Sequence, residues 1–223
     1  MPEVTVETYS DDHAGEAPVR GFLHRAAASS GDALVLTHGA SGNCNGPLLV
    51  ALAGAFAASG LSVLRCDLPF RQTRPQGPPS PGHAQEDQEG LLRAVTLLKE
   101  QLSGRVFLGG QSYGGRQASL LAASGLSLAS GLLLLSYPLH PPGRPAQLRT
   151  AHFPKLETPA LFVSGTKDAF GSVQELETAI KLIPAKTRFI PVPGAGHSLL
   201  TKANRQKLPE TIVETFRMFV EES

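Results

Sequence analysis

The residues best suited to chemistry in this chain are the serine and glycines of Gly110-Gln111-Ser112-Tyr113-Gly114. This stretch matches the pattern G-x-S-x-G, with an apolar run before it and a helix-like run after it. A serine held in a sharp strand-to-helix turn needs glycine two residues to either side, because larger side chains would collide with neighbouring backbone. The alternative is an ordinary glycine-rich turn with a capping serine. The flanking strand and helix favour a hydroxyl placed for nucleophilic attack.

A serine hydroxyl needs a general base, and three histidines follow expected parallel strands: His38, His140 and His197. His197 lies in the glycine-bracketed segment 193–198, between the last expected strand and the last expected helix. Its position gives the chain order serine, acid, histidine, so we expect His197 to be the base. His38 is better placed to shape a turn as a structural imidazole, and His140 remains the secondary alternative.

The base in turn needs a carboxylate that orients it. Asp168 ends the run 161–168 and lies in the loop after an expected strand, and the spacing leaves room for one strand–helix unit between Asp168 and His197. We therefore expect Asp168 to be the acid of the triad. Asp67 follows an earlier strand and is the alternative, although a turn or capping carboxylate is its simpler interpretation.

Two backbone N–H groups are candidates for binding a developing oxyanion. One belongs to Tyr113, the residue after the nucleophile, and the other to Ala40, in the small-residue loop 37–43 that follows the strand at 33–37. Small residues let this loop approach a substrate carbonyl closely. Alone, the same loop would be an unexceptional glycine turn.

The elements that must position these residues alternate between short β-like runs and longer helical patterns. Strands are expected at 4–9, 18–25, 33–37, 61–66, 105–109, 131–139, 158–165 and 187–192, and helices at 47–59, 91–102, 115–124, 173–183 and 208–222. Such alternation predicts a mostly parallel α/β sheet with helices on both faces, formed by one domain over residues 1–223. In such sheets, functional loops follow the carboxyl ends of the strands.

Three local features refine this pattern. The carboxylates Glu86, Asp87 and Glu89 precede one helix and are expected to complement its dipole. The spacing of Ser172 and Glu175 predicts a capping box. The proline-rich segment 68–83 is expected to lack regular structure.

Composition excludes several other classes of function. Lys and Arg number 20 against 19 Asp and Glu, so there is no electrostatic footprint for nucleic acid or for an anionic membrane. The all-leucine run 132–135, like every other aliphatic run in the sequence, is far too short to span a bilayer. Cys44 and Cys66 show no metal-like spacing and are expected to be free thiols. With no signal-like N-terminus and no dinucleotide, phosphate-loop or metal motif, we expect a cytoplasmic protein that needs no cofactor and no metal.

Taken together, THGASG, GGQSYGGR, LSYPLH, LFVSGTKDAFG and GAGHS resemble the α/β-hydrolase superfamily. More narrowly, they resemble small lidless hydrolases related to dienelactone hydrolase and to the testis-expressed and chromatin-complex hydrolase-like group. The likeness extends from about residue 33 to the C-terminus and is weakest at 69–90. It implies an α/β-hydrolase fold of about seven or eight strands, with Ser112, Asp168 and His197 as the catalytic residues. Dienelactone hydrolases proper use cysteine as nucleophile, so their activity does not carry over.

The sequence therefore predicts a serine hydrolase that acts on a small-molecule carboxylic ester, with a thioesterase as a close variant. A non-catalytic interaction or scaffold protein on the same fold is the competing hypothesis. The short connection 140–159 leaves no room for a large lid, so the site is expected to be open, with the proline-rich loop 69–83 at its rim. Arg71 and Arg74 in that loop are interpreted as solvated surface side chains rather than as contacts for an acidic substrate.

Overall fold

The structure is a computed structural model that describes residues 4–26, 28–80, 82–125 and 127–222. Within these residues the strands form one eight-stranded sheet in the order β1-β2-β4-β3-β5-β6-β7-β8. The strands are β1 (Thr5–Asp11), β2 (Val19–Arg25), β3 (Ala33–Thr37), β4 (Ser62–Asp67), β5 (Val106–Gln111), β6 (Leu132–Leu135), β7 (Ala160–Gly165) and β8 (Thr187–Val192). β2 pairs antiparallel with both β1 and β4, and the strands from β4 to β8 pair in parallel. The expected mostly parallel sheet is confirmed.

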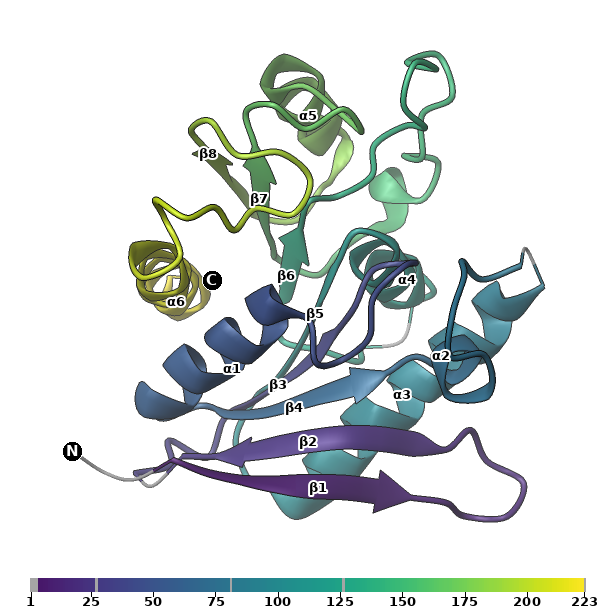
Figure 1. Ribbon diagram of the computed structural model, residues 1–223, viewed down its shortest axis with the longest axis vertical. Coiled ribbons are helices and arrows are strands. Elements are labelled where there is room, and N and C mark those ends of the chain that lie inside the picture. The colour runs from purple at the N-terminus through teal and green to yellow at the C-terminus, as the bar shows by residue number, and fades with distance from the viewer. Residues whose placement is uncertain (1–3, 27, 81, 126, 223) are drawn as a thin grey trace.

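Helices cover both faces of this sheet (Figure 1). They are α1 (Pro47–Ala58), α2 (Pro69–Thr73), α3 (His83–Gln101), α4 (Tyr113–Ala122), α5 (Val173–Ala179) and α6 (Lys207–Glu221), with 3-10 turns η1 (Phe153–Lys155) and η2 (Ile180–Leu182). α1 and α6 pack on one face, whereas α3, α4 and α5 pack on the other. Strands buried on both sides read as continuous apolar runs, which is why 33–37 and 132–135 carry no polar alternation.

Alternate residues of the central strands serve the two cores. Leu34 and Leu36 of β3 join the core under α1 and α6, whereas Val35 between them joins the core under α3 and α4. In the first core, the ring of Phe216 meets Phe56 and Phe107 edge to face, with centroids 5.6 and 5.2 Å apart. Burial of each such side chain stabilises the fold by roughly 1.5–3 kcal/mol. This packing holds the sheet in place, and the loops at the ends of its strands position the candidate site described below.

The proline-rich segment departs from expectation, because residues 69–73 form the short helix α2. Pro69 occupies the first turn of this helix, where a proline costs no intrahelical hydrogen bond and its φ is already helical. The ring of Phe70 is fully buried and anchors α2 against the fold. The prediction of irregular structure throughout 68–83 was therefore wrong at 69–73 and at His83, where α3 begins.

The predicted capping box is confirmed at the start of α5. The backbone N–H of Glu175 donates to the Ser172 hydroxyl, and the Glu175 carboxylate accepts from the Ser172 N–H at 2.8 Å. Among the described residues, no helix combines the length and the apolar character needed to cross a membrane.

Candidate active site

Ser112 lies in a strained turn between β5 and α4. Its backbone adopts φ 51° and ψ −115°, a conformation rare for any residue but glycine, and its N–H donates to Leu135 O at 2.7 Å. A Cβ added to Gly110 would lie 2.6 Å from the backbone of Gly114, and one added to Gly114 would lie 2.5 Å from His38 O. These approaches confirm that the turn requires glycine on both sides of Ser112.

The structure brings the side chains of Ser112, His197 and Asp168 into one hydrogen-bonded chain. His197 Nε2 lies 2.8 Å from Ser112 Oγ, and His197 Nδ1 lies 2.9 and 3.0 Å from the two carboxylate oxygens of Asp168. An ionised carboxylate only accepts hydrogen bonds, so Nδ1 carries the imidazole proton and Nε2 is free to accept from the serine hydroxyl. The three residues follow β5, β8 and β7, whose carboxyl ends meet at the same edge of the sheet.

The imidazole of His197 is held from two directions. The Asp168 side chain is 1% exposed and accepts a further bond from the Phe170 N–H at 2.9 Å, which fixes the carboxylate. The ring of Phe170 stacks on the imidazole with centroids 4.1 Å apart and an interplanar angle of 29°. The His197 side chain itself is 29% exposed, so part of it reaches solvent.

The loop after β3 lies directly beside the serine. A Cβ added to Gly39 would be 3.4 Å from the Cβ of Ser112. His38 Nδ1 lies 2.8 Å from Gly39 O, and the Leu68 N–H donates to His38 Nε2, so the proton of the ring is on Nδ1. Burial lowers the pKa of His38, which keeps the imidazole neutral in this arrangement. His38 therefore has the structural role that the sequence indicated.

The bond from His38 also orients the next N–H group. Gly39 O and the Ala40 N–H belong to one planar peptide unit and point in opposite directions. With the carbonyl turned to the His38 ring, the Ala40 N–H faces away from that ring. Tyr113 is the first residue of α4, so its N–H has no intrahelical acceptor. Tyr113 follows Ser112 in the chain, and Gly39, the residue before Ala40, lies beside Ser112 in space.

Arg71 corrects one expectation about the proline-rich segment. Its side chain is buried and donates to four carbonyl oxygens, those of Ala40, Gly42, Arg74 and Gly77, at 2.8–2.9 Å. The interpretation of Arg71 as a solvated surface side chain was therefore wrong. A guanidinium offers five N–H donors in a fixed plane, which suits it to tie two loops together. Arg74, by contrast, is exposed as expected.

The alternative acid and the alternative bases lie outside the serine's hydrogen-bonding reach. Asp67 Oδ1 accepts from the Cys44 N–H at 2.6 Å and lies 3.5 Å from His38 Nε2, which matches its simpler interpretation as a turn carboxylate. His140 is buried with Nδ1 2.8 Å from Pro141 O. Among the three strand-end histidines, the structure places His197 in contact with Ser112.

The two cysteines are free and buried, as expected. Burial, together with the nearby Asp67 carboxylate, raises the pKa of Cys44 to about 12, and burial raises that of Cys66 as well. Both thiols stay protonated near neutral pH and are poor nucleophiles. In the described part of the chain, no group of three His, Cys, Asp or Glu side chains is arranged to hold a metal ion.

Asp87 was missed by the sequence reasoning, which grouped it with the helix-dipole carboxylates. It is fully buried, accepts from the Tyr113 hydroxyl at 2.7 Å and accepts from the Phe70 N–H at 3.0 Å. Burial raises the pKa of its carboxyl, and these two hydrogen bonds oppose that rise. Asp87 thus links α2 and α3 to the residue beside the nucleophile. The contact joins distant segments, and no local pattern in the sequence signals it.

The comparison with known proteins shows the family of the chain. Residues 30–221 match a family model described as an alpha/beta hydrolase domain. The chain belongs to the alpha/beta hydrolase family. The resemblance expected from the sequence motifs is confirmed at this level.

Solved structures show the same fold as this alpha/beta hydrolase. Dienelactone hydrolase from Anabaena variabilis is 18% identical with a TM-score of 0.76, over 97% of this chain and 98% of that one. An alpha-beta serine hydrolase homologue from Coxiella burnetii is 19% identical, with a TM-score of 0.74 over 94% and 96% of the two chains. A serine hydrolase without a lid from Xanthomonas campestris is 18% identical, with a TM-score of 0.72 over 95% and 94%. This alpha/beta hydrolase also lacks a large cap, because the described connection between β6 and β7 contains only the short turn η1 as a helical element.

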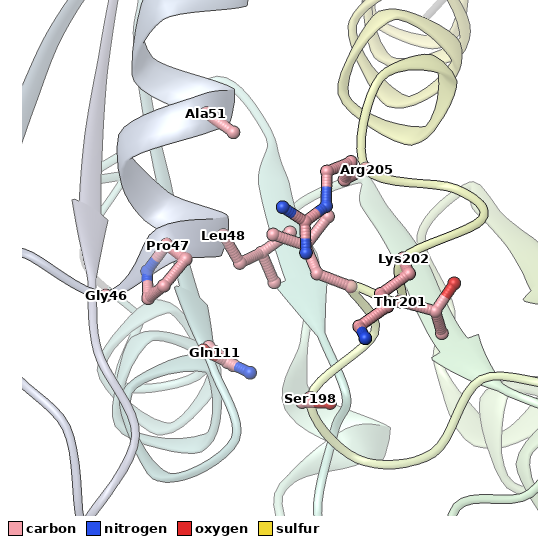
Figure 2. A pocket seen from close by; sticks show the side chains of 10 residues that line it. Gly46, Pro47, Leu48, Ala51, Gln111, Ser198, Thr201, Lys202 and Arg205 are labelled. Atoms are coloured by element: carbon pink, nitrogen blue, oxygen red, sulfur yellow. The ribbon is translucent and has the colours of Figure 1, made fainter.

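A pocket of about 680 Å³ opens in this alpha/beta hydrolase beside the segments that carry Ser112 and His197. Figure 2 shows it between the N-terminal end of α1 and the loop that leads from β8 to α6. Gln111 and Ser198, the chain neighbours of Ser112 and His197, contribute to its lining. The α1 side is apolar, with Pro47, Leu48 and Ala51, and the opposite loop adds Leu200, Thr201, Lys202 and Arg205.

Proposed function

We propose that this alpha/beta hydrolase is a serine hydrolase that cleaves carboxylic esters through an acyl-enzyme intermediate. The observation that carries the proposal is the hydrogen-bonded chain from Ser112 through His197 to Asp168, with Nε2 free to accept the serine proton. A serine hydroxyl is a weak nucleophile by itself, and this arrangement supplies both a base and the group that orients the base.

In the acylation step, Ser112 Oγ attacks the ester carbonyl carbon while His197 Nε2 takes the hydroxyl proton. Asp168 stabilises the imidazolium that forms and keeps its Nδ1–H aligned. The carbonyl oxygen becomes an oxyanion that accepts hydrogen bonds from the Ala40 and Tyr113 N–H groups, each worth roughly 3 kcal/mol in the transition state. The C–O bond to the alcohol then breaks, and His197 returns the proton to the leaving oxygen.

Deacylation repeats the same steps with water as the nucleophile. His197 Nε2 removes a proton from the water molecule, and the hydroxide adds to the acyl carbonyl at the same oxyanion site. Collapse of this intermediate releases the carboxylic acid, and the proton on His197 restores the Ser112 hydroxyl. The reaction consumes one ester and one water and needs no cofactor.

The pocket of Figure 2 supports a small-molecule substrate. Its volume of about 680 Å³ is in the range of small-ligand sites, and the apolar side chains Leu48, Ala51 and Leu200 suit a hydrocarbon part of the ester. A thioester would use the same residues, because only the leaving atom changes from oxygen to sulfur. The comparison of acyl esters with matched acyl thioesters therefore decides between the two.

The test combines covalent labelling with turnover. A fluorophosphonate should add one phosphonyl group to the wild-type protein, detected by intact mass, and should add none to Ser112→Ala. The wild type should hydrolyse p-nitrophenyl acetate much faster than the same control. If the wild type is unlabelled and no faster than Ser112→Ala, the proposal is wrong and a non-catalytic role on this fold takes its place.

A further inference from the structure

A second pocket, of about 420 Å³, lies between α4 and the connection from β6 to β7. One wall comes from Arg116 and Leu120 of α4 and from Ala123 directly after it, and the opposite wall includes Arg149, His152 and Lys155. We call it the Arg116–Arg149 pocket. It shares no lining residue with the pocket beside the triad.

The lining of this pocket is cationic without a matching acid. Arg116, Arg149 and Lys155 line it, and the lining contains no Asp or Glu. Among the described residues, no carboxylate forms an ion pair with any of these three. Other arginines of the chain do have such partners, for example Arg93 with Asp11 and Arg105 with Asp32.

The two arginines are also poorly satisfied as hydrogen-bond donors. Arg116 Nε is buried and has no partner within the described part of the chain. The Arg149 side chain makes one weak bond, from Nη1 to Pro138 O at 3.3 Å. Since a guanidinium carries five donors, most of the donor capacity at this pocket is unused. A buried donor without an acceptor is destabilising unless a ligand supplies one.

The positive charges act on one another. Burial and the nearby Arg116 charge both lower the pKa of Arg149. The same two causes lower the pKa of His152 to about 4, so this imidazole is neutral near pH 7, with Nε2 2.8 Å from Ser119 Oγ. Like charges close together in a half-buried site favour binding of an anion. The anion offsets the repulsion between them and accepts hydrogen bonds from their unpaired N–H groups.

We propose that the Arg116–Arg149 pocket binds the phosphate group of a small organic phosphate. Two guanidinium groups and one ammonium match a dianion with several acceptor oxygens better than a single carboxylate. The remaining walls, Leu120, Ala123 and Leu148, are apolar, and the Leu148 side chain is 53% exposed at the rim. These walls fit the hydrocarbon body of such a ligand, so a free inorganic phosphate should bind more weakly than an aryl phosphate.

The pocket is connected to the catalytic elbow through one helix. Arg116 lies one turn after Ser112, and its backbone N–H donates to Ser112 O at 2.9 Å. Its side chain, however, is not part of the triad or of the pocket beside it. The proposal therefore stands apart from ester hydrolysis, and binding should be the same in wild type and in Ser112→Ala.

Isothermal titration calorimetry at fixed ionic strength tests the proposal with three probes: phenyl phosphate, inorganic phosphate and benzoate. Phenyl phosphate should bind saturably at one site, more tightly than either other probe. Arg149→Gln and Arg116→Gln should each weaken phenyl phosphate binding by about tenfold or more, since each removes charge-assisted hydrogen bonds. Arg144→Gln is the matched control, because Arg144 is an exposed arginine of the same connection outside the pocket lining, and its affinity should equal that of wild type.

A melting curve without ligand adds an independent measurement. If the Arg149 charge serves to bind an anion, Arg149→Gln removes the repulsion between Arg149 and Arg116. This variant should then not lower Tm in the absence of phosphate. A purely structural Arg149 would lower it. The proposal is wrong if wild type binds no phenyl phosphate, or if Arg149→Gln binds it as tightly as wild type. Arg149 lies in a connection rather than in a helix or strand, so this variant is informative even if Arg116→Gln fails to fold.

Discussion

His38 donates a hydrogen bond from Nδ1 to the carbonyl oxygen of Gly39, the next residue in the chain, over 2.8 Å. The ring is fixed from its other side by the Leu68 N–H, so the direction of this bond is determined. The Gly39 carbonyl also accepts from the Gly42 N–H at 3.1 Å, and because this carbonyl and the Ala40 N–H share one peptide plane, the two bonds together determine where the Ala40 N–H points. His38 is thus a positioning residue for the proposed oxyanion site, although it touches no reacting atom.

Substitution His38→Ala should lower kcat for p-nitrophenyl acetate with little change in KM, because a misaligned donor weakens binding of the oxyanion more than of the ground-state ester. Complete loss of such a donor lowers kcat by about 10²- to 10³-fold, and this is the upper limit for the effect of His38→Ala. His38→Asn places a side-chain N–H near the same carbonyl and should restore part of the rate. A loss of stability with unchanged kcat in both variants would mean that His38 only supports the fold.

Substitution Asp168→Asn should reduce kcat by roughly 10³- to 10⁴-fold, because the amide donates where the carboxylate accepted and selects the wrong imidazole tautomer. Asp67→Asn is the matched control, since Asp67 was the alternative acid and its Oδ1 accepts from the Cys44 N–H, as an amide oxygen also can. Steady-state kinetics of the two purified variants decides the assignment. Comparable losses in both would contradict the role given to Asp168.

The order of elements was accessible from the sequence, and so was the meeting of Ser112, Asp168 and His197. Each of these residues lies at or soon after the carboxyl end of a parallel strand, and these ends share one edge of the sheet. The Ser172–Glu175 capping box was equally accessible, because its partners are three residues apart. Local residue spacing and the direction of the strands are sufficient to predict such features.

Arg71 and Asp87 show where sequence reasoning reaches its limit. Both look like surface charges in polar segments, yet both are buried because they pair with backbone groups of other segments. Arg71 joins the loop after β3 to the proline-rich segment, and Asp87 joins α3 to Tyr113 and Phe70. Such contacts depend on how segments pack in three dimensions, and backbone partners, such as the carbonyls at Arg71 and the Phe70 N–H at Asp87, leave no trace in residue types.

Two glycine-to-alanine substitutions should have opposite effects on stability. In Gly114→Ala the new Cβ would lie 2.5 Å from His38 O and 2.7 Å from Thr37 Cγ2, so the elbow must shift, at a cost of about 1–3 kcal/mol or more. In Gly54→Ala the Cβ meets nothing within 4 Å in the middle of α1, and the free energy of unfolding should rise by about 0.5–1 kcal/mol. Urea denaturation measures both. A Gly114→Ala protein as stable and as active as wild type would contradict the tight elbow.

The stability of the fold should fall as the pH is lowered from about 6.5 toward 4. Burial and the Arg65 charge lower the pKa of His24 to about 4, and Arg65 Nε donates to His24 Nε2 at 2.8 Å. The unfolded chain, with histidine pKa near 6.5, binds more protons than the native protein in this window, so acid favours unfolding. Above about pH 7 both states are neutral at this residue, and the effect vanishes.

Melting temperatures at pH 5, 6 and 7 check this expectation. In His24→Gln the amide oxygen can still accept from Arg65, but the side chain cannot take up a proton, so Tm should fall less between pH 7 and pH 5 than in wild type. His13→Gln is the matched control, because it removes a histidine whose side chain is 74% exposed and leaves the buried pair of His24 and Arg65 intact. Burial raises the pKa of Asp87, so this residue makes the fold more stable at low pH, opposite to His24. Asp87 is present in all three proteins, so its effect cancels when their Tm profiles are compared. Parallel profiles for His24→Gln and wild type would show that His24 does not couple folding to pH.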